Sequence, residues 1–135
     1  MELLETLGQF EGLILTAIKH LKEDAYGMQI YGEVCRMADR DVNLGSMYVA
    51  LERLKKKGYV KYRVERGGPA RRGKPRKFYT LLPLGAEVLL NSVETAKRMA
   101  ATYSSSEYED QDGHRPDHSR VVGFSGGTLS PEESS

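Results

Sequence analysis

Residues 43–81, NLGSMYVALERLKKKGYVKYRVERGGPARRGKPRKFYTL, decide the fold of this chain. Asn43 is a good N-cap and Gly58 a common helix stop, so a helix is predicted at 44–57. Its apolar residues recur at helical spacing and should face the core; they are Leu44, Met47, Tyr48, Leu51 and Leu54. After Gly58, the segments YVKYRVER and KFYTL alternate β-branched or aromatic residues with charged ones and flank the loop GGPARRGKP. The stretch therefore predicts a helix followed by a β-hairpin.

The same stretch carries a dense positive charge. From Arg53 to Lys77 there are twelve Lys and Arg and one acid, Glu65, a local charge of +11, whereas the whole chain of 135 residues has a net charge of +1. Such a cluster needs a polyanion, a membrane surface or much solvent to offset its self-repulsion, and nucleic acid is the commonest polyanion. The charge pattern therefore favours binding to nucleic acid.

Two further helices are predicted before this stretch. Apolar residues recur at three- and four-residue steps from Phe10 to Leu21, which indicates a first helix. Asp24 stands where the N-cap of a second helix belongs. The apolar stripe of that second helix consists of Tyr26, Ile30, Val34 and Met37.

A long helix is predicted after the hairpin. Pro83 suits its first turn, and the apolar residues that follow recur about every 3.5 residues, the spacing of a coiled-coil seam. The seam consists of Ala86, Leu89, Val93, Ala96, Ala100 and Tyr103. We expect this helix to mediate dimerisation, although its stripe could instead pack on the first helix of the same chain.

The order of elements is helix, helix, helix, basic hairpin and long helix. This order predicts a mainly α fold with a small β-hairpin (α+β), namely a winged helix-turn-helix with a long C-terminal dimerisation helix. The second and third helices would form the crossing pair, and the hairpin would be the wing. At 1.5 Å per residue the third helix is about 20 Å long and fits the major groove of DNA.

Composition then divides the chain into three segments. Residues 1–82 should form the winged helix-turn-helix, residues 83–104 the dimerisation helix, and residues 105–135 a disordered acidic tail. This tail could be an inert extension, or it could fold back on the basic patch. The single cysteine, Cys35, together with the absence of a long apolar stretch or a basic signal sequence, favours a cytoplasmic protein.

Several motifs resemble the PadR family of bacterial and archaeal transcriptional regulators. They are LGQFEGLILTAI, DAYGMQIYGEV, NLGSMYVALERLKKKGYV and GKPRKFYTLLPLG, and together they cover about residues 7–100. The resemblance implies a dimeric winged-helix repressor of the short subclass that uses its last helix for dimerisation. The sequence departs from the family in having Leu82 where a Thr usually caps that helix. It also has no Trp, a residue with which some members stack planar drugs.

Specific residues can be assigned to DNA contact. On the third helix, Ser46, Val49 and Arg53 are expected to read bases, with Ala50 small enough to let the helix approach. Asn43 could contact DNA or act only as an N-cap, Tyr48 could be a core residue or a phosphate contact, and Lys57 should lie on the outward side. The resemblance favours phosphate contact for Tyr48. The wing residues expected to contact phosphates are Arg63, Arg66, Arg71, Arg72, Lys74 and Arg76.

The sequence gives little support to an enzyme. The segment GPARRGK has the spacing of a phosphate-binding loop, but Pro75 replaces the required Ser or Thr, and a predicted strand follows in place of a helix. Cys35 has no evident base partner, and we expect no catalytic residue, metal site or cofactor. The expected partners are double-stranded DNA, a second copy of the chain and an unidentified small-molecule effector. The alternative function is a winged-helix module that binds protein or RNA and has no operator.

Overall fold

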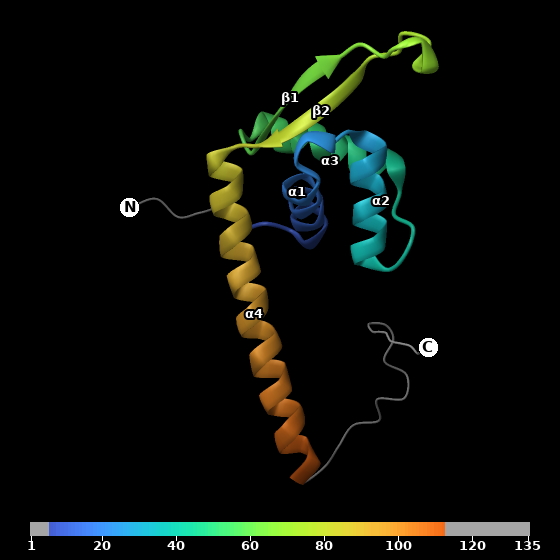
Figure 1. Cartoon of the computed structure of the whole chain (residues 1–135). Helices are drawn as coiled ribbons and strands as arrows, with labels where there is room; N and C mark the ends of the chain where they lie inside the picture. Colours follow the sequence, from blue (N-terminus) through green and yellow to red (C-terminus); the bar gives the residue numbers. More distant parts are fainter. Residues whose placement is uncertain (1–5, 113–135) are drawn as a thin grey trace. The chain divides into compact units, whose positions relative to one another are not determined.

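The computed structural model describes residues 6–112, except for the side chains of Arg71 and of residues 107–112. These residues belong to two compact units, divided between Thr95 and Ala96. The elements in chain order are α1 (Gln9–Leu21), the 3-10 helix η1 (Lys22–Asp24), α2 (Gly27–Ala38), α3 (Leu44–Lys56), β1 (Val60–Glu65), the 3-10 helix η2 (Pro69–Arg71), β2 (Arg76–Leu81) and α4 (Pro83–Asp112) (Figure 1). The predicted fold class, α+β with a winged helix-turn-helix, is confirmed.

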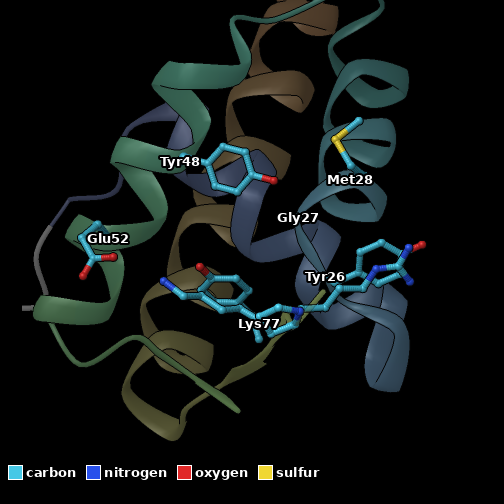
Figure 2. A pocket seen from close by; sticks show the side chains of 9 residues that line it. Tyr26, Gly27, Met28, Tyr48, Glu52 and Lys77 are labelled. Atoms are coloured by element: carbon cyan, nitrogen blue, oxygen red, sulfur yellow. The ribbon is translucent and has the colours of Figure 1, made fainter. Parts of the chain in front are cut away.

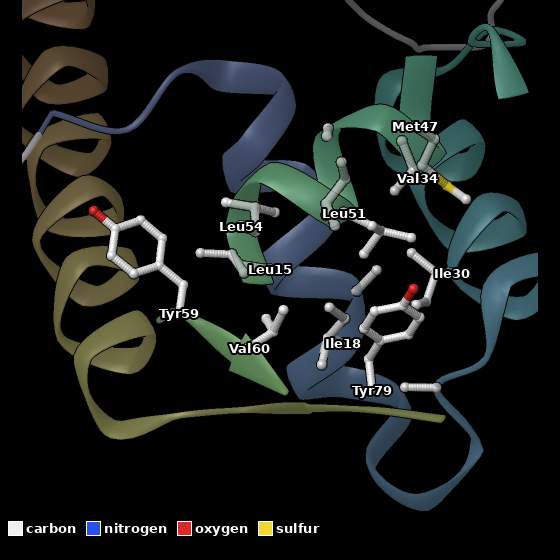
Figure 3. Packing of buried hydrophobic residues seen from close by; sticks show 14 of the residues in the cluster. Leu15, Ile18, Ile30, Val34, Met47, Leu51, Leu54, Tyr59, Val60 and Tyr79 are labelled. Atoms are coloured by element: carbon white, nitrogen blue, oxygen red, sulfur yellow. The ribbon is translucent and has the colours of Figure 1, made fainter. Parts of the chain in front are cut away.

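The core of the first unit lies where its helices and the hairpin converge. Figure 3 shows Leu15 and Ile18 of α1 packed among side chains of α2, α3 and both strands. The largest fully buried side chains are Ile14, Leu15, Ile18, Ile30, Met47, Leu51, Leu54, Val34, Val60 and Val88. Burial of each such side chain stabilises the fold by about 1.5–3 kcal/mol relative to leaving it exposed. This shared core fixes α3 and the base of the hairpin relative to each other.

The second helix begins later than the sequence predicted. Asp24 ends the 3-10 turn η1 and is not the N-cap of α2; the N-cap is Tyr26, which has an extended backbone. The reason is a long-range contact, because Tyr26 forms an antiparallel bridge with Phe78 of β2. A residue held in this extended pairing cannot be helical, so α2 starts at Gly27.

The two strands form an antiparallel hairpin whose register runs from Val60 opposite Leu81 to Glu65 opposite Arg76. The inner end of the hairpin is buried, since Val60 and Tyr79 belong to the core. The outer end is exposed on β1 and carries the loop between the strands. The hairpin is therefore anchored at one end and projects from the core at the other (Figure 1).

The start of α4 packs tightly against Tyr59, in the segment between α3 and β1. The Leu82 amide donates a hydrogen bond of 2.9 Å to the Tyr59 carbonyl oxygen. A Cβ atom added to Gly85 would collide with that same oxygen, so only glycine fits there. Val88 and Leu89, which follow one turn later, are buried in the core.

Two expectations for the C-terminal part need correction. Leu89, predicted to lie on the dimerisation seam, is 5% exposed and packs into the core of its own chain. The helix also continues to Asp112, so residues 105–112 of the predicted disordered tail are helical, because the SSSEYEDQD segment contains no Gly or Pro to stop the helix. Residues 113–135, the remainder of that predicted tail, lie outside the described residues.

Candidate nucleic-acid interface

The buried side of α3 differs from the predicted stripe. Met47, Ala50, Leu51 and Leu54 are fully buried, whereas Leu44 is 37% exposed. Ala50 therefore faces the core and cannot approach DNA, contrary to our expectation. Leu44 lies outside the core because the centre of the buried side is set by Met47, Ala50 and Leu54, which pack against α1, α2 and β1.

The beginning of α3 is fixed by its cap. The Asn43 side-chain oxygen accepts a hydrogen bond of 2.7 Å from the Ser46 amide. This bond satisfies one of the amides left unpaired at a helix start, so the capping role predicted for Asn43 is confirmed. The Ser46 side chain remains exposed at the same end of the helix.

The exposed side of α3 presents a mixed set of residues. At about 100° per residue, Val49 and Glu52 each lie about 150° from the centre of the buried stripe, and Lys56 lies further round still. Val49 is 60% exposed, and Glu52 and Lys56 are exposed as well. Ser46 and Arg53 lie on one flank of this side, at about 90–110° from the buried stripe.

Tyr48 occupies the opposite flank of α3 and is 43% exposed, so it is not a core residue. Its hydroxyl reaches the first residue of α2, because a Cβ atom added to Gly27 would overlap the Tyr48 oxygen. Figure 2 shows the Tyr48 ring projecting from α3 toward α2. The start of α2 has no side-chain cap, and amides at a helix start attract anions. The Tyr48 hydroxyl therefore lies where a phosphate would be favoured.

A cleft of about 440 Å³ separates α3 from the hairpin. Side chains of α3, of the start of α2 and of β2 surround it (Figure 2). Its lining residues are Tyr26, Gly27, Met28, Tyr48, Glu52, Pro75, Arg76, Lys77 and Tyr79. Burial, with a smaller contribution from the Glu52 carboxylate, raises the pKa of Tyr79 from 10.0 to about 12, so its hydroxyl stays protonated.

The hairpin is bound to the start of α2 by backbone and ring contacts. The Tyr79 amide donates a hydrogen bond of 2.8 Å to the Ala25 carbonyl oxygen. The rings of Tyr26 and Phe78 meet edge to face at 5.4 Å, and the Arg76 guanidinium lies 4.0 Å from the centre of the Tyr26 ring. These contacts hold the cation of Arg76 beside the start of α2, within the cleft.

The other cations of the hairpin lie along its strands and loop. Arg63 stacks over Phe78 at 4.8 Å and pairs with Glu65 at 2.7 Å, and Lys77 lies 4.6 Å from the Tyr62 ring centre. Arg66 is exposed, Arg72 and Lys74 are exposed in the loop, and the side chain of Arg71 lies outside the described part of the chain. The hairpin thus presents most of its predicted cations to solvent.

Arg53 and Lys57 have a different environment from the one predicted. Arg53 Nε and Lys57 Nζ each lie 3.7 Å from Glu11 Oε2 of α1. The Arg53 side chain is still 54% exposed, so it can reach outward from this flank. An acid partner nevertheless offsets part of the charge that both residues would bring to DNA.

Sequence reasoning missed several residues of this interface. Tyr26 and Met28 at the start of α2 line the cleft, and Glu52 and Lys56 lie on the outward side of α3. A helical wheel centred on Met47 would have found the last two. No local signal identifies Tyr26, because its place depends on the distant Phe78.

The structure also bears on the phosphate-binding loop, metal ligands, membrane helix and dimerisation residues considered from the sequence. The GPARRGK segment contains the 3-10 turn η2 and leads into strand β2, so no α-helix follows it. Among the described residues, no group of three or more His, Cys, Asp and Glu could hold a metal ion. No helix within residues 6–112 is long and apolar enough to cross a membrane. Of the predicted dimerisation residues apart from Leu89, all are exposed.

Comparison with known proteins agrees with this geometry. The model of the transcriptional regulator PadR-like family matches residues 14–91. No curated protein matches the chain. A PadR-like transcription factor from Bacteroides fragilis is 28% identical, with 73% of this chain and 89% of that chain covered and a TM-score of 0.59.

Two further solved structures share the fold. A PadR family regulator from Clostridium difficile R20291 is 24% identical, with 73% of this chain and 97% of that chain covered and a TM-score of 0.59. A PadR-like regulator from Bacillus cereus is 24% identical, with 70% of this chain and 87% of that chain covered and a TM-score of 0.59. Members of this family are transcription regulators and not enzymes. Since the family model spans more than half of the chain, this protein belongs to the PadR-like family of transcriptional regulators and is a DNA-binding regulator.

Proposed function

We propose that this protein is a homodimeric repressor that binds a palindromic operator, with α3 in the major groove and the hairpin on the adjacent backbone. The observation that carries the proposal is the fixed position of the basic hairpin beside the exposed side of α3, across the cleft. A groove about 12 Å wide admits one α-helix. With α3 in the groove, the hairpin cations face the phosphates that border the groove.

The contacts divide into base reading and positioning. Ser46, Val49 and Arg53 read base edges from the outward side and one flank of α3, where Val49 suits a thymine methyl and Arg53 a guanine. Positioning contacts to phosphates come from Asn43, Tyr48, Lys57, Arg63, Arg66, Arg71, Arg72, Lys74 and Arg76.

The start of α2 supplies a phosphate site to this arrangement. The Tyr48 hydroxyl, the Arg76 guanidinium stacked on Tyr26 and the amides of the first turn of α2 come from three separate elements. Backbone amides at a helix start and a neighbouring guanidinium are both typical phosphate ligands. A phosphate bound there would set the depth of α3 in the groove.

Dimerisation is assigned to α4. Its exposed apolar residues recur at the spacing of a coiled-coil seam, and with Leu89 assigned to the core of its own chain, the seam consists of Ala86, Val93, Ala96, Ala100 and Tyr103. A two-fold dimer places its two α3 helices on half-sites about one helical turn apart. Sedimentation equilibrium should give twice the monomer mass, and Val93→Glu should lower it by putting a charge into the seam.

A small-molecule effector completes the proposal. A change at the dimer interface would alter the spacing of the two α3 helices and so release the operator. BpsR from Bordetella bronchiseptica, which has the same fold at 16% identity, is a protein whose DNA binding is regulated by 6-hydroxynicotinic acid.

Fluorescence anisotropy with genomic DNA fragments selected by binding tests the proposal. If about six hairpin cations per dimer bind phosphates, a plot of log affinity against log salt concentration should have a slope near −5. Ser46→Ala and Arg53→Ala should reduce discrimination between sequences, whereas Arg72→Ala should weaken binding to all DNA alike. Arg98→Ala on α4, a change of equal charge, is the control.

The alternative, a module that binds protein or RNA without an operator, predicts other results. In that case no fragment is enriched over random DNA, and neither class of substitution changes sequence preference. A salt slope near zero would also refute the electrostatic part of the proposal.

A further inference from the structure

An acidic side chain lies within the otherwise basic interface. Glu52 is exposed on the outward side of α3, immediately before the segment of +11 charge. It lines the cleft together with Tyr48 of the same helix and with Arg76 and Lys77 of the hairpin (Figure 2). Any DNA that reaches Val49 must therefore also pass close to this carboxylate.

The position of Glu52 has no evident role in stability. Within the described part of the chain, no Lys or Arg forms an ion pair with its carboxylate, although the cations of the cleft are near. The side chain is also too exposed to contribute to the core. A carboxylate that faces DNA repels phosphates, so it lowers the affinity for DNA in general.

Base edges in the major groove offer partners for such a carboxylate. Cytosine presents a single polar group there, the N4 amino donor, whereas adenine presents its N6 donor beside the N7 acceptor, which repels a carboxylate. Guanine and thymine present only acceptors. A carboxylate on the outward side of a helix in this groove therefore selects cytosine.

We propose that Glu52 determines operator sequence by accepting a hydrogen bond from the N4 amino group of one cytosine in each half-site. Sites without that cytosine leave the carboxylate facing an acceptor or a phosphate. The repulsion by the carboxylate therefore lowers the affinity for incorrect sequences more than the affinity for the operator. This inference rests on the proposed placement of α3 in the major groove.

Binding selection from a randomised duplex pool tests the inference, followed by affinity measurements on duplexes that differ at one base pair. The wild-type protein should prefer cytosine at one position of each half-site by about 5- to 150-fold, the range for one good base contact. Glu52→Ala should lose this preference and bind random DNA more tightly. Glu52→Gln should shift it toward adenine, because glutamine pairs with N6 and N7 together.

The control is Glu87→Gln, which makes the same charge change at an exposed position of α4 outside the proposed interface and should keep the wild-type preference. If the wild-type protein selects an operator and Glu52→Gln selects the same bases, Glu52 acts only through charge, and the inference is wrong while the proposed function stands. If the wild-type protein selects no sequence, the proposed function fails as well.

Discussion

Replacing Gly27 with alanine should weaken DNA binding without unfolding the protein. Gly27 is the first residue of α2, and a methyl group there would overlap the Tyr48 hydroxyl and lie 2.9 Å from Tyr48 Cζ. Because the Tyr48 ring is half exposed, it can swing away from α2 and take its hydroxyl with it. In the proposed complex, the Tyr48 hydroxyl of the variant no longer reaches the phosphate at the start of α2.

The size of the effect follows from the strength of a hydrogen bond between a hydroxyl and a charged phosphate. A hydrogen bond to a charged group contributes about 1.5–3 kcal/mol, which corresponds to a rise of about 10- to 150-fold in Kd per half-site. The free energy of unfolding should change by less than about 1 kcal/mol, since no buried side chain is displaced.

Gly32 of the same helix provides the matched control. A Cβ atom added there meets nothing within 4 Å, so Gly32→Ala should leave Kd unchanged and stabilise the fold by up to about 1 kcal/mol through helix propensity. Fluorescence anisotropy gives Kd, and urea unfolding gives stability. Tyr48→Phe, which removes only the hydroxyl, should weaken binding to a similar degree. Equal Kd values for the Gly27 and Gly32 variants would refute the assignment of Tyr48 to a phosphate.

Three other substitutions probe separate parts of the first unit. Gly85→Ala should lower the free energy of unfolding by about 1–3 kcal/mol in urea titrations, because its methyl group collides with the Tyr59 carbonyl. Glu11→Gln should raise affinity for all DNA sequences by about 2- to 5-fold in anisotropy measurements, because it removes the acid beside Arg53 and Lys57. The pKa of the Tyr79 hydroxyl is about 12 in the folded state and 10.0 as its ordinary value, so the protonated hydroxyl favours the folded state. This contribution to stability is complete below pH 10 and is lost as the pH rises through 12. Over that range the melting temperature should fall less steeply in Tyr79→Phe than in the wild type.

Local signals in the sequence were sufficient where one residue determines the structure. Asn43 identified the first turn of α3, and Pro83 the first turn of α4, because capping and proline geometry act within one helical turn. Asp24 failed as a cap because the bridge from Tyr26 to Phe78, 52 positions away, decides where α2 begins. Long-range pairing of this kind leaves no mark on the local sequence.

The nucleic-acid interface, too, could be predicted only where the local sequence determines the structure. Arg72 and Lys74 were predictable as exposed cations because they lie in a loop rich in Gly and Pro, and such loops run over the protein surface. Which residues of α3 face outward was only partly predictable, since Leu44 and Met47 fit a helical stripe equally well. The packing of α3 against α1 and α2 decides between them, since it buries Met47 and leaves Leu44 partly exposed, and it thereby brings Glu52 to the outward side.

The hydrogen bond from Tyr79 to Ala25 has a consequence for the kind of DNA that this protein prefers. It joins the base of the hairpin to the segment before α2, so in the proposed complex the hairpin cannot tilt freely to follow the backbone. A duplex must therefore match a fixed separation between the groove floor and the flanking phosphates, or bend to reach it. Sequences that differ in groove width or stiffness would differ in affinity even at base pairs that no side chain contacts.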